Sequence, residues 1–397
     1  PSELQTQAND LIRIFLPIVV TVSAATALFW GLTGTWMDAV LNSMAVLLVA
    51  CPCALGLATP VAISQGLFRL AQLGLVSRDG ALIDALARTR RVFFDKTGTL
   101  SESDLRVTEL WVDTDLPIKR DELLASVLAA ESGLEHPVAR ALTKYLKSEG
   151  IEDSCELQNL QIVAGQGIAY NFDAGEVRHR FQVGEASLAG SDQAIEEVVK
   201  ALHESKGRRV FVYLDDRVVA CLVLGERLRV GVDQIWATLD ALEIRSHILT
   251  GDPFPELTLP PGVKIEQGLS SADKVERVRD SAGAGESPLF VGDGINDVAA
   301  MLQASASIAM HAGAGLARSV AMGQLSDDQI EVIPRAVSLS RAILRKLRGN
   351  LLYAFVYNLI GMALAAAGLL HPVAAALIML VSSFWVTARA LSGHPRI

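Results

Sequence analysis

Long stretches without a charged residue are the feature that most restricts how this chain can fold. Ile14–Met37 and Ala39–Phe68 are uncharged, with Asp38 between them, and Gly349–Ala388 is uncharged near the other end of the sequence. A helix needs about 20 apolar residues to cross a hydrocarbon core of about 30 Å. The first two stretches each suffice for one span, and the third suffices for two, divided near Gly368. The sequence therefore predicts four membrane spans.

Basic residues flank these stretches on the side of the long central region. Because cytoplasmic loops are enriched in Lys and Arg, we expect this region and both chain ends to lie in the cytoplasm. The predicted protein is integral to a membrane, with lipid as a partner, and a bacterial cytoplasmic membrane is the expected location. The residues concerned are Arg69, Arg78, Arg88, Arg90, Arg91, Arg341, Arg345, Lys346 and Arg348.

The composition fits a chain with two populations of segments. Hydrophobic residues make up 51% of the 397 residues, yet 20% are charged, so apolar spans must alternate with a charged globular part. The net charge is −9 and no Lys/Arg-rich tract is present, which argues against a nucleic-acid partner. Four cysteines do not suggest a disulfide framework.

The central region alternates strand-like and helix-like segments, which predicts a parallel sheet with helices on both faces. Between Ser101 and Gly207 the pattern changes to helices followed by short strands, as in an inserted α+β domain. We therefore predict membrane segments at 1–84 and 339–397, an α/β domain at 85–103 and 208–338, and an insert at 104–207. The strands expected in the parallel sheet are Arg91–Phe94, Val210–Leu214, Val218–Leu224, Ser246–Leu249 and Leu289–Val291, with helices such as Val232–Leu242 and Ala272–Ser281 between them.

The segment Asp95-Lys96-Thr97-Gly98-Thr99-Leu100 follows the apolar strand Val92–Phe94. An aspartate at the carboxyl edge of such a strand projects into the crevice where α/β folds place their chemistry. The Thr and Gly residues after it offer a turn suited to a phosphoryl group. The Asp95 carboxylate can therefore act as a nucleophile toward phosphate.

Two further polar turns follow predicted strands. Thr250-Gly251-Asp252 comes after the strand that ends at Leu249, and Gly292–Asp297 comes after the strand that ends at Val291. With Asp95 they bring polar groups to one crevice, where Lys274 can supply a cation. Asp95 and Asp293 form a natural pair for Mg²⁺.

This set of motifs, in this order, resembles the haloacid-dehalogenase-like phosphorylation domain of P-type ATPases. The resemblance implies that Asp95 is phosphorylated from ATP, and that Mg²⁺ is bound by Asp95, Asp293 and the backbone carbonyl of Thr97. It also implies that Asn296 and Asp297 complete the network around the site. The catalytic residues that the resemblance assigns besides Asp95 and Thr97 are Lys96, Thr250, Gly251, Asp252, Lys274, Asn296 and Asp297.

The insert carries Glu131, then Glu135-His136-Pro137, then Gly165-Gln166-Gly167. In this position the three motifs resemble the ATP-binding domain of the heavy-metal branch of P-type ATPases. The resemblance implies that His136 packs on adenine and that Gly165 and Gly167 let the backbone approach the nucleotide. Leu134 departs from the serine that usually precedes Glu-His-Pro in that branch.

Cys51-Pro52-Cys53 lies inside a predicted span. Proline opens a helix, which is tolerated in a membrane where a cavity or site needs it. Two thiolates beside such a break are soft ligands suited to Cu(I) or Zn(II). The alternative is a pair of small buried residues that only pack.

The last two spans help to choose the transported ion. No Asp, Glu or Lys occurs between Gly349 and Ala388, whereas a divalent ion would call for an intramembrane carboxylate. Tyr357-Asn358 and a Met379-x-x-Ser382 sequence resemble the signature of the Cu(I)-transporting subgroup, which implies a copper chaperone or other copper donor as a partner. A Zn(II) or Cd(II) pump of the same branch and a membrane-tethered phosphatase stay open as alternatives.

The resemblance covers nearly the whole chain, but the chain begins at Pro1 and contains no Thr-Gly-Glu loop. We therefore expect a chain that is truncated at its N-terminus. The parts expected to be missing are upstream spans, the actuator domain that carries that loop, and any N-terminal metal-binding domain.

Overall fold

The computed structural model describes residues 3–50, 53–152, 155–163, 166–174, 177–188, 207–252 and 259–391, and the single positions 195, 198, 199, 202 and 257. Two compact units make up the chain. The first comprises Pro1–Lys96, Val230–Pro253 and Leu259–Ile397, and the second comprises Thr97–Arg229 with Phe254–Thr258.

The first unit contains the predicted parallel sheet. Its seven strands follow the order β1-β13-β12-β11-β2-β9-β10, and every neighbouring pair is parallel except β1 with β13. Strands β2, β9 and β11, at its centre, match the predicted positions, whereas the four outer strands were not predicted. The strand bounds are β1 Leu75–Ser77, β2 Arg91–Asp95, β9 Arg245–Leu249, β10 Lys264–Glu266, β11 Pro288–Gly292, β12 Ala306–Ala309 and β13 Gly323–Leu325.

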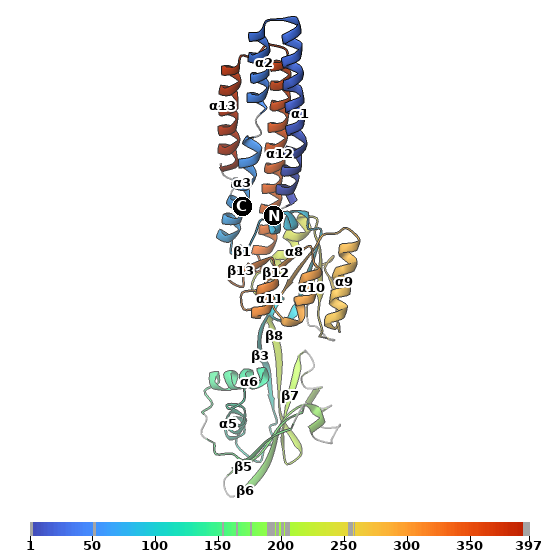
Figure 1. Ribbon diagram of the computed structural model, residues 1–397. Coiled ribbons are helices and arrows are strands. Elements are labelled where there is room, and N and C mark those ends of the chain that lie inside the picture. The colour runs from blue at the N-terminus through green and yellow to red at the C-terminus, as the bar shows by residue number, and fades with distance from the viewer. Residues whose placement is uncertain are drawn as a thin grey trace. The chain divides into compact units, whose positions relative to one another are not determined.

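Helices cover both faces of this sheet because alternate side chains of β2 point in opposite directions. Phe94 meets Trp236 of α8 edge-on, with ring centroids 5.5 Å apart. Phe93 belongs to a different buried cluster, which includes Val278 of α9. Figure 1 shows these helices beside the strands. The helices are α4 Ala81–Arg88, α8 Val232–Ala241, α9 Ser271–Gly283, α10 Val298–Gln303 and α11 Gly315–Val320.

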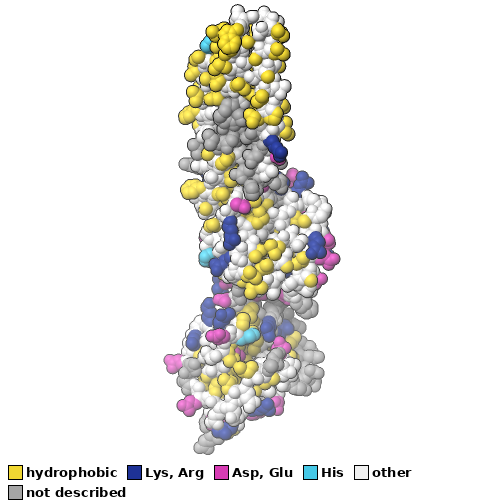
Figure 2. All heavy atoms as spheres, viewed as in Figure 1, with side chains coloured by type: hydrophobic (Ala, Val, Ile, Leu, Met, Phe, Trp, Pro, Cys, Tyr) yellow, Lys and Arg dark blue, Asp and Glu magenta, His cyan; other side chains and the backbone are white. Residues whose placement is uncertain are grey.

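The uncharged stretches form long helices in the same unit. Three of them are long and apolar enough to span a membrane among the residues described, at Arg13–Thr33, Val332–Ala366 and Pro372–Arg389. The second predicted span consists of two helices, α2 and α3. The surface over this bundle is mostly hydrophobic in Figure 2, as expected for lipid contact. The helix bounds are α1 Glu3–Thr33, α2 Trp36–Val49, α3 Cys53–Gln72, α12 Val332–Ala366 and α13 Pro372–Leu391.

The sequence suggested that Asp38 separates the first two spans, but in the structure the break between the helices comes before Asp38. The first helix ends at Thr33, and Asp38 lies in the first turn of α2. Its carboxylate accepts hydrogen bonds from the backbone N–H and the hydroxyl of Thr35, at 2.9 and 2.7 Å. The charge therefore caps the helix start, where backbone N–H groups would otherwise lack partners.

Helix α12 is continuous over 35 residues and packs closely on α2 and α3. A Cβ added to Gly361 would lie 2.5 Å from Cγ2 of Val49, and one added to Gly66 would lie 3.0 Å from Cδ1 of Ile343. Below the apolar part, the Arg341 guanidinium donates to the carbonyl oxygens of Leu242 and Thr89, at 2.6 and 2.9 Å. One helix thus belongs both to the apolar bundle and to the α/β part.

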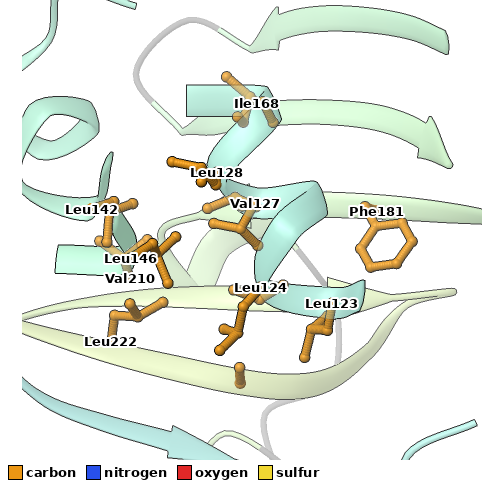
Figure 3. Close-up of a cluster of buried hydrophobic side chains, with 14 of the residues drawn as sticks. Leu123, Leu124, Val127, Leu128, Leu142, Leu146, Ile168, Phe181, Val210 and Leu222 are labelled. Carbon is orange, nitrogen blue, oxygen red and sulfur yellow. The ribbon is translucent and has the colours of Figure 1, made fainter. Parts of the chain in front are cut away.

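The second unit is an antiparallel sheet with the strand order β3-β8-β7-β6-β5-β4. Helices α5 (Arg120–Glu131) and α6 (Pro137–Ser148) correspond to the helices predicted for the insert. Their leucines and valines pack on the sheet in the cluster of Figure 3, as Leu124 and Val127 do near Leu222. The strand bounds are β3 Ser101–Val112, β4 Gln158–Val163, β5 Gly167–Ala174, β6 Val177–Gly184, β7 Arg208–Leu214 and β8 Arg217–Leu228.

The prediction that residues 208–224 belong to the parallel sheet is wrong. β7 and β8 are antiparallel neighbours inside the second sheet, so the boundary lies at 229/230 and not at 207/208, and the other boundary lies at 96/97 and not at 103/104. The prediction failed because β8 is buried on both of its faces. Val219 and Leu222 of β8 join the core under α5 and α6, whereas Val218 and Cys221 join a cluster with Val198 on the opposite face. A strand buried on both sides is continuously apolar, which also typifies a parallel strand.

Candidate active site

Asp95 stands at the carboxyl end of β2, between the ends of β9 and β11. Because these strands are parallel, the residues that follow them meet at one edge of the sheet, as predicted. Carboxylate oxygens of Asp95, Asp293 and Asp297 all lie within 4.8 Å of one another. The structure therefore brings three of the four acidic residues predicted for this site into one cluster.

Lys274 completes this cluster from α9. It lies four residues before Val278, on the same face of the helix, and Val278 packs near Phe93 on the side of β2 from which Asp95 projects. Its Nζ is 2.5 Å from Oδ1 of Asp95 and 2.9 Å from Oδ1 of Asp297. Burial lowers the pKa of Lys274, but the two carboxylates outweigh burial and raise it. The ammonium therefore stays charged beside Asp95.

The cluster suits a divalent cation. Burial, and then the charge of Asp297, raise the pKa of Asp95 to about 7, although Lys274 acts in the opposite direction. Asp95 is only 7% exposed, so its charge is poorly hydrated without a counter-ion. Mg²⁺ prefers oxygen ligands from one or two carboxylates. Asp95 and Asp293 offer that donor set.

The turn after β9 supports the opposite side of the crevice. Lys96 is buried, and its Nζ lies 2.5 Å from Oδ2 of Asp252. Thr250 is buried, and its Oγ1 accepts a hydrogen bond of 3.1 Å from the backbone N–H of Asp252. At Gly251 a Cβ would lie 3.3 Å from the carbonyl oxygen of Leu269. The predicted Thr-Gly-Asp turn thus meets the residue that follows Asp95.

The turn after β11 places Asp297 inward and Asn296 outward. Asp297 is buried and also accepts a hydrogen bond of 3.3 Å from the backbone N–H of Gly294. Asn296 is exposed, so its part in the predicted network stays a prediction. A Cβ added to Gly292 would lie 2.8 Å from Oδ2 of Asp297, which explains a glycine there.

One supporting loop was missed from sequence. The backbone N–H of Ala314 donates to the carbonyl oxygen of Asp293 at 2.7 Å, and a Cβ on Gly313 would lie 2.9 Å from the same oxygen. The loop therefore fixes the backbone of Asp293. The glycines of this turn, just after β12, were the available signal.

Thr97 is the first residue of the second unit. Its Oγ1 donates to Oε1 of Glu226 at 3.2 Å, and Gly98 after it has a φ of +76°, the left-handed region that glycine tolerates best. The role of the Thr97 carbonyl toward Mg²⁺ stays a prediction.

The second unit has a pocket of about 300 Å³ where the ATP site was predicted. It brings together Glu131, His136 and Gly167, whereas Gly165 lies outside the described residues. Residues Gly184, Arg208 and Arg209 also line it and were missed, because nothing near them in sequence marks them as ligands.

Helix ends position the two polar residues of this pocket. Glu131 ends α5 and is buried, and burial raises its pKa to about 7. His136 caps the start of α6, where its Nδ1 accepts a hydrogen bond of 3.3 Å from the backbone N–H of Val138. Both side chains are therefore held by the helix pair and line the pocket.

Two glycines form a close backbone contact in the pocket wall. Gly167 of β5 pairs with Gly184 of β6. A Cβ on Gly184 would lie 2.0 Å from the carbonyl oxygen of Gln166, and one on Gly167 would lie 2.1 Å from that of Val183. Neither position has room for a side chain. Gly167 also has a φ of +148°, which favours glycine.

Four of the predicted ion-site residues lie on two apolar helices, Tyr357 and Asn358 on α12 and Met379 and Ser382 on α13. Asn358 of α12 is 1% exposed, and its Oδ1 has no hydrogen-bond partner among the described residues. The hydroxyl of the adjacent Tyr357 is also buried without a partner in the described part of the chain. On α13, Ser382 is buried and donates to the carbonyl oxygen of Met379 at 2.9 Å. Cys51 lies outside the described residues, as does the side chain of Cys53.

Comparisons with known proteins agree with this geometry. Residues 89–305 match the haloacid dehalogenase-like hydrolase family. A probable copper-exporting P-type ATPase V of Mycobacterium tuberculosis is 34% identical over 98% of this chain and 51% of its own length. A copper-exporting P-type ATPase of Staphylococcus haemolyticus is 31% identical over 98% of this chain and 49% of its own.

Among solved structures, a zinc-transporting PIB-type ATPase in the E2.Pi state superposes with a TM-score of 0.82 at 27% identity. The match covers 98% of this chain and 66% of that one. The chain spans about half the length of the curated relatives it matches. It belongs to the haloacid dehalogenase-like hydrolases and, among them, to the heavy-metal P-type ATPases.

Proposed function

We propose that this chain is the ATP-consuming part, with associated membrane spans, of a pump that exports Cu(I) through an aspartyl-phosphate intermediate. The observation that carries the proposal is the buried Asp95 carboxylate, held 2.5 Å from the Lys274 ammonium at the ends of parallel strands. A nucleophile beside a fixed cation in a poorly hydrated crevice suits attack on a phosphoryl group.

In the proposed step, a carboxylate oxygen of Asp95 forms a bond to the γ-phosphorus of ATP as the bond to the ADP oxygen breaks. Lys274 offsets negative charge on the transferred group, and Asp297 holds the Lys274 ammonium in place. Mg²⁺, when bound by Asp95 and Asp293, supplies further charge neutralisation. Lys96, paired with Asp252, places a second cation next to Asp95 along the chain.

ATP is proposed to bind in the pocket of the second unit. Glu131 and His136 offer polar contacts at the helix ends, and the contact between Gly167 and Gly184 leaves backbone uncovered by side chains. The pocket lining is otherwise largely apolar, as is usual for a site that takes a planar base.

The proposal of Cu(I) rests on the chemistry of the membrane helices. No carboxylate or lysine occurs in Gly349–Ala388, and the predicted ligands are the thiolates of Cys51 and Cys53, with Met379 as a soft neighbour and Tyr357, Asn358 and Ser382 nearby. Soft donors without a carboxylate favour a soft monovalent ion. Two relatives are named copper-exporting, whereas a solved neighbour is zinc-transporting, so a Zn(II) or Cd(II) pump is the alternative.

Location and partners follow from the same proposal. The exposed apolar side chains on the long helices suit lipid, and a bacterial cytoplasmic membrane fits the basic residues beside the spans. A copper chaperone or another copper donor would deliver the ion. A phosphatase tethered to the membrane would share Asp95, but it would have no need of the pocket of the second unit.

The test uses the full-length natural protein in detergent with ATP labelled at the γ-phosphate. We expect acid-stable label on the wild type and none on Asp95→Asn, whose amide is not a nucleophile. Label on the Asn variant would refute the assignment. Release of phosphate from small esters without label from ATP would indicate the phosphatase. Stimulation by Zn²⁺ and not by Cu(I) would move the protein to the divalent branch.

A further inference from the structure

The chain enters and leaves the second unit through two neighbouring segments, residues 97–101 and 226–229. The first contains the turn after Asp95 and Lys96, and the second is the end of β8 with the residue after it. Ser101 pairs with Leu228 where β3 and β8 begin to run together. Both segments lie within the second unit, so the bonds between them do not depend on the first.

Arg229 binds three successive carbonyl oxygens of the turn. Its backbone N–H donates to Leu100 at 2.9 Å, its Nε donates to Thr99 at 3.0 Å, and its Nη2 donates to Gly98 at 2.9 Å. A guanidinium presents its donors in a rigid planar fork, so it fixes the direction of both carbonyls at once. Hydrogen bonds from a charged donor are also stronger than neutral ones.

Glu226 binds the two hydroxyls at the ends of the same turn. Its Oε1 accepts from Oγ1 of Thr97 at 3.2 Å, and its Oε2 accepts from Oγ of Ser101 at 2.5 Å. Every residue from 97 to 101 is therefore bonded to either Glu226 or Arg229. The turn held by these two residues includes Gly98, whose φ of +76° lies in the left-handed region.

We propose that Arg229 and Glu226 are positioning residues for phosphoryl transfer. The proposal rests on the proposed function, because its consequence is felt at Asp95. Asp95 and Lys96 are joined directly to Thr97, whose hydroxyl is bound by Glu226, and the next three carbonyls, of Gly98, Thr99 and Leu100, cannot turn without breaking a bond to Arg229. The pair thus fixes the side chain of Thr97 and the backbone that follows it, and so restricts the orientation of the Thr97 carbonyl, the predicted third ligand of Mg²⁺.

The test compares variants of the full-length protein. Arg229→Gln removes the fork, Arg229→Lys keeps the charge but offers only a point donor, and Glu226→Gln keeps one acceptor. Arg227→Gln is the matched control, because Arg227 lies two residues before Arg229 at the end of β8, is exposed, and gives the same change of charge. The measurements are the initial rate of label transfer from saturating ATP, the Mg²⁺ concentration for half the maximal rate, and nucleotide affinity by calorimetry.

We expect Arg229→Gln to slow label transfer between about tenfold and about a hundredfold, which is the effect of small misplacements of reacting groups. It should also raise the Mg²⁺ requirement, with Arg229→Lys intermediate and Glu226→Gln milder. Nucleotide affinity should stay within about twofold of wild type, because the ATP pocket is formed elsewhere in the unit. Arg227→Gln should behave as wild type.

Equal rates and Mg²⁺ requirements for Arg229→Gln and Arg227→Gln would overturn the proposal. If Arg229→Gln fails to fold, the test rests on Arg229→Lys and Glu226→Gln. Wild-type transfer rates and Mg²⁺ requirements in both of these variants would also overturn the proposal. A parallel loss of nucleotide affinity and rate would indicate a general structural role and would also refute positioning. Absence of label on the wild type would instead refute the proposed function.

Discussion

A single methyl group at Gly184 should disable the nucleotide pocket. In Gly184→Ala the new Cβ would lie 2.0 Å from the carbonyl oxygen of Gln166 and 2.8 Å from Cα of Gly167, both backbone atoms. Ordinary contact begins at 3.4 Å, so β5 and β6 must separate by more than 1 Å. Gly184 pairs with Gly167, so the movement falls on the pocket wall itself.

The expected magnitudes follow from that displacement. Overpacking of this kind costs about 1–3 kcal/mol of folding free energy, which is less than the free energy of unfolding of about 5–15 kcal/mol that is typical of folded domains. A wall displaced by about 1 Å should weaken ATP binding by between about tenfold and about a hundredfold, because a contact moved that far leaves hydrogen-bond distance and loses about a quarter to a half of its dispersion energy. Phosphorylation by inorganic phosphate, which does not use this pocket, should change little.

The assay is calorimetric titration of the full-length protein with ATP, accompanied by melting temperatures. Gly133→Ala is the matched control, because Gly133 lies in the same unit and a Cβ there would meet no atom of the described residues within 4 Å. The reasoning is refuted if Gly184→Ala binds ATP as tightly as Gly133→Ala does. The reasoning is also refuted if phosphorylation by ATP and phosphorylation by inorganic phosphate decrease equally in Gly184→Ala while the fold is intact.

Three further predictions concern the same sites. His136→Gln should weaken ATP binding while sparing phosphorylation by inorganic phosphate, and an equal loss in both assays would exclude a role at the adenine. Folding raises the pKa of Glu131 from 4.5 to about 7, so the unfolded chain ionises first and this residue destabilises the fold increasingly between those pH values, by about 3 kcal/mol in all. Glu131→Gln should therefore raise the melting temperature at pH 8 but not at pH 4.5, and an equal shift at both would contradict the pKa. Cys51→Ala with Cys53→Ala should abolish Cu(I) binding in competition with a chelator, and unchanged affinity would exclude this site.

The clustering of the candidate active-site residues was predictable because it depends on local order. Asp95 and Thr250 each come directly after a short buried strand segment, and parallel strands bring the residues at their carboxyl ends to one edge of the sheet. Lys274 was predictable as a cation between two such turns, although only the structure shows that α9 points it at Asp95.

The parts that failed depend on contacts between distant segments. Nothing within β8 shows that residues on its second face pack in a cluster with Val198 and Leu202, so its apolar run was assigned to the wrong sheet. Gly184 needs a glycine only because Gly167 stands opposite it in the sheet. Arg229 is likewise one arginine among several until its fork is seen on Gly98 and Thr99.

Because helix α12 is continuous, a rotation of its apolar part about the helix axis would be carried to the α/β part of the same unit. At about 1.5 Å of rise per residue, the 35 residues of α12 are about 52 Å long, and Asn358 lies about 25 Å from Arg341 along the helix axis. Arg341 fixes the rotation of this helix, because its guanidinium donates hydrogen bonds to the carbonyl oxygens of Leu242 and Thr89. Thr89 lies just before β2, the strand that ends at Asp95. A rotation of α12 about its own axis would therefore either break the hydrogen bonds of Arg341 or displace the backbone just before β2, the strand that ends at Asp95.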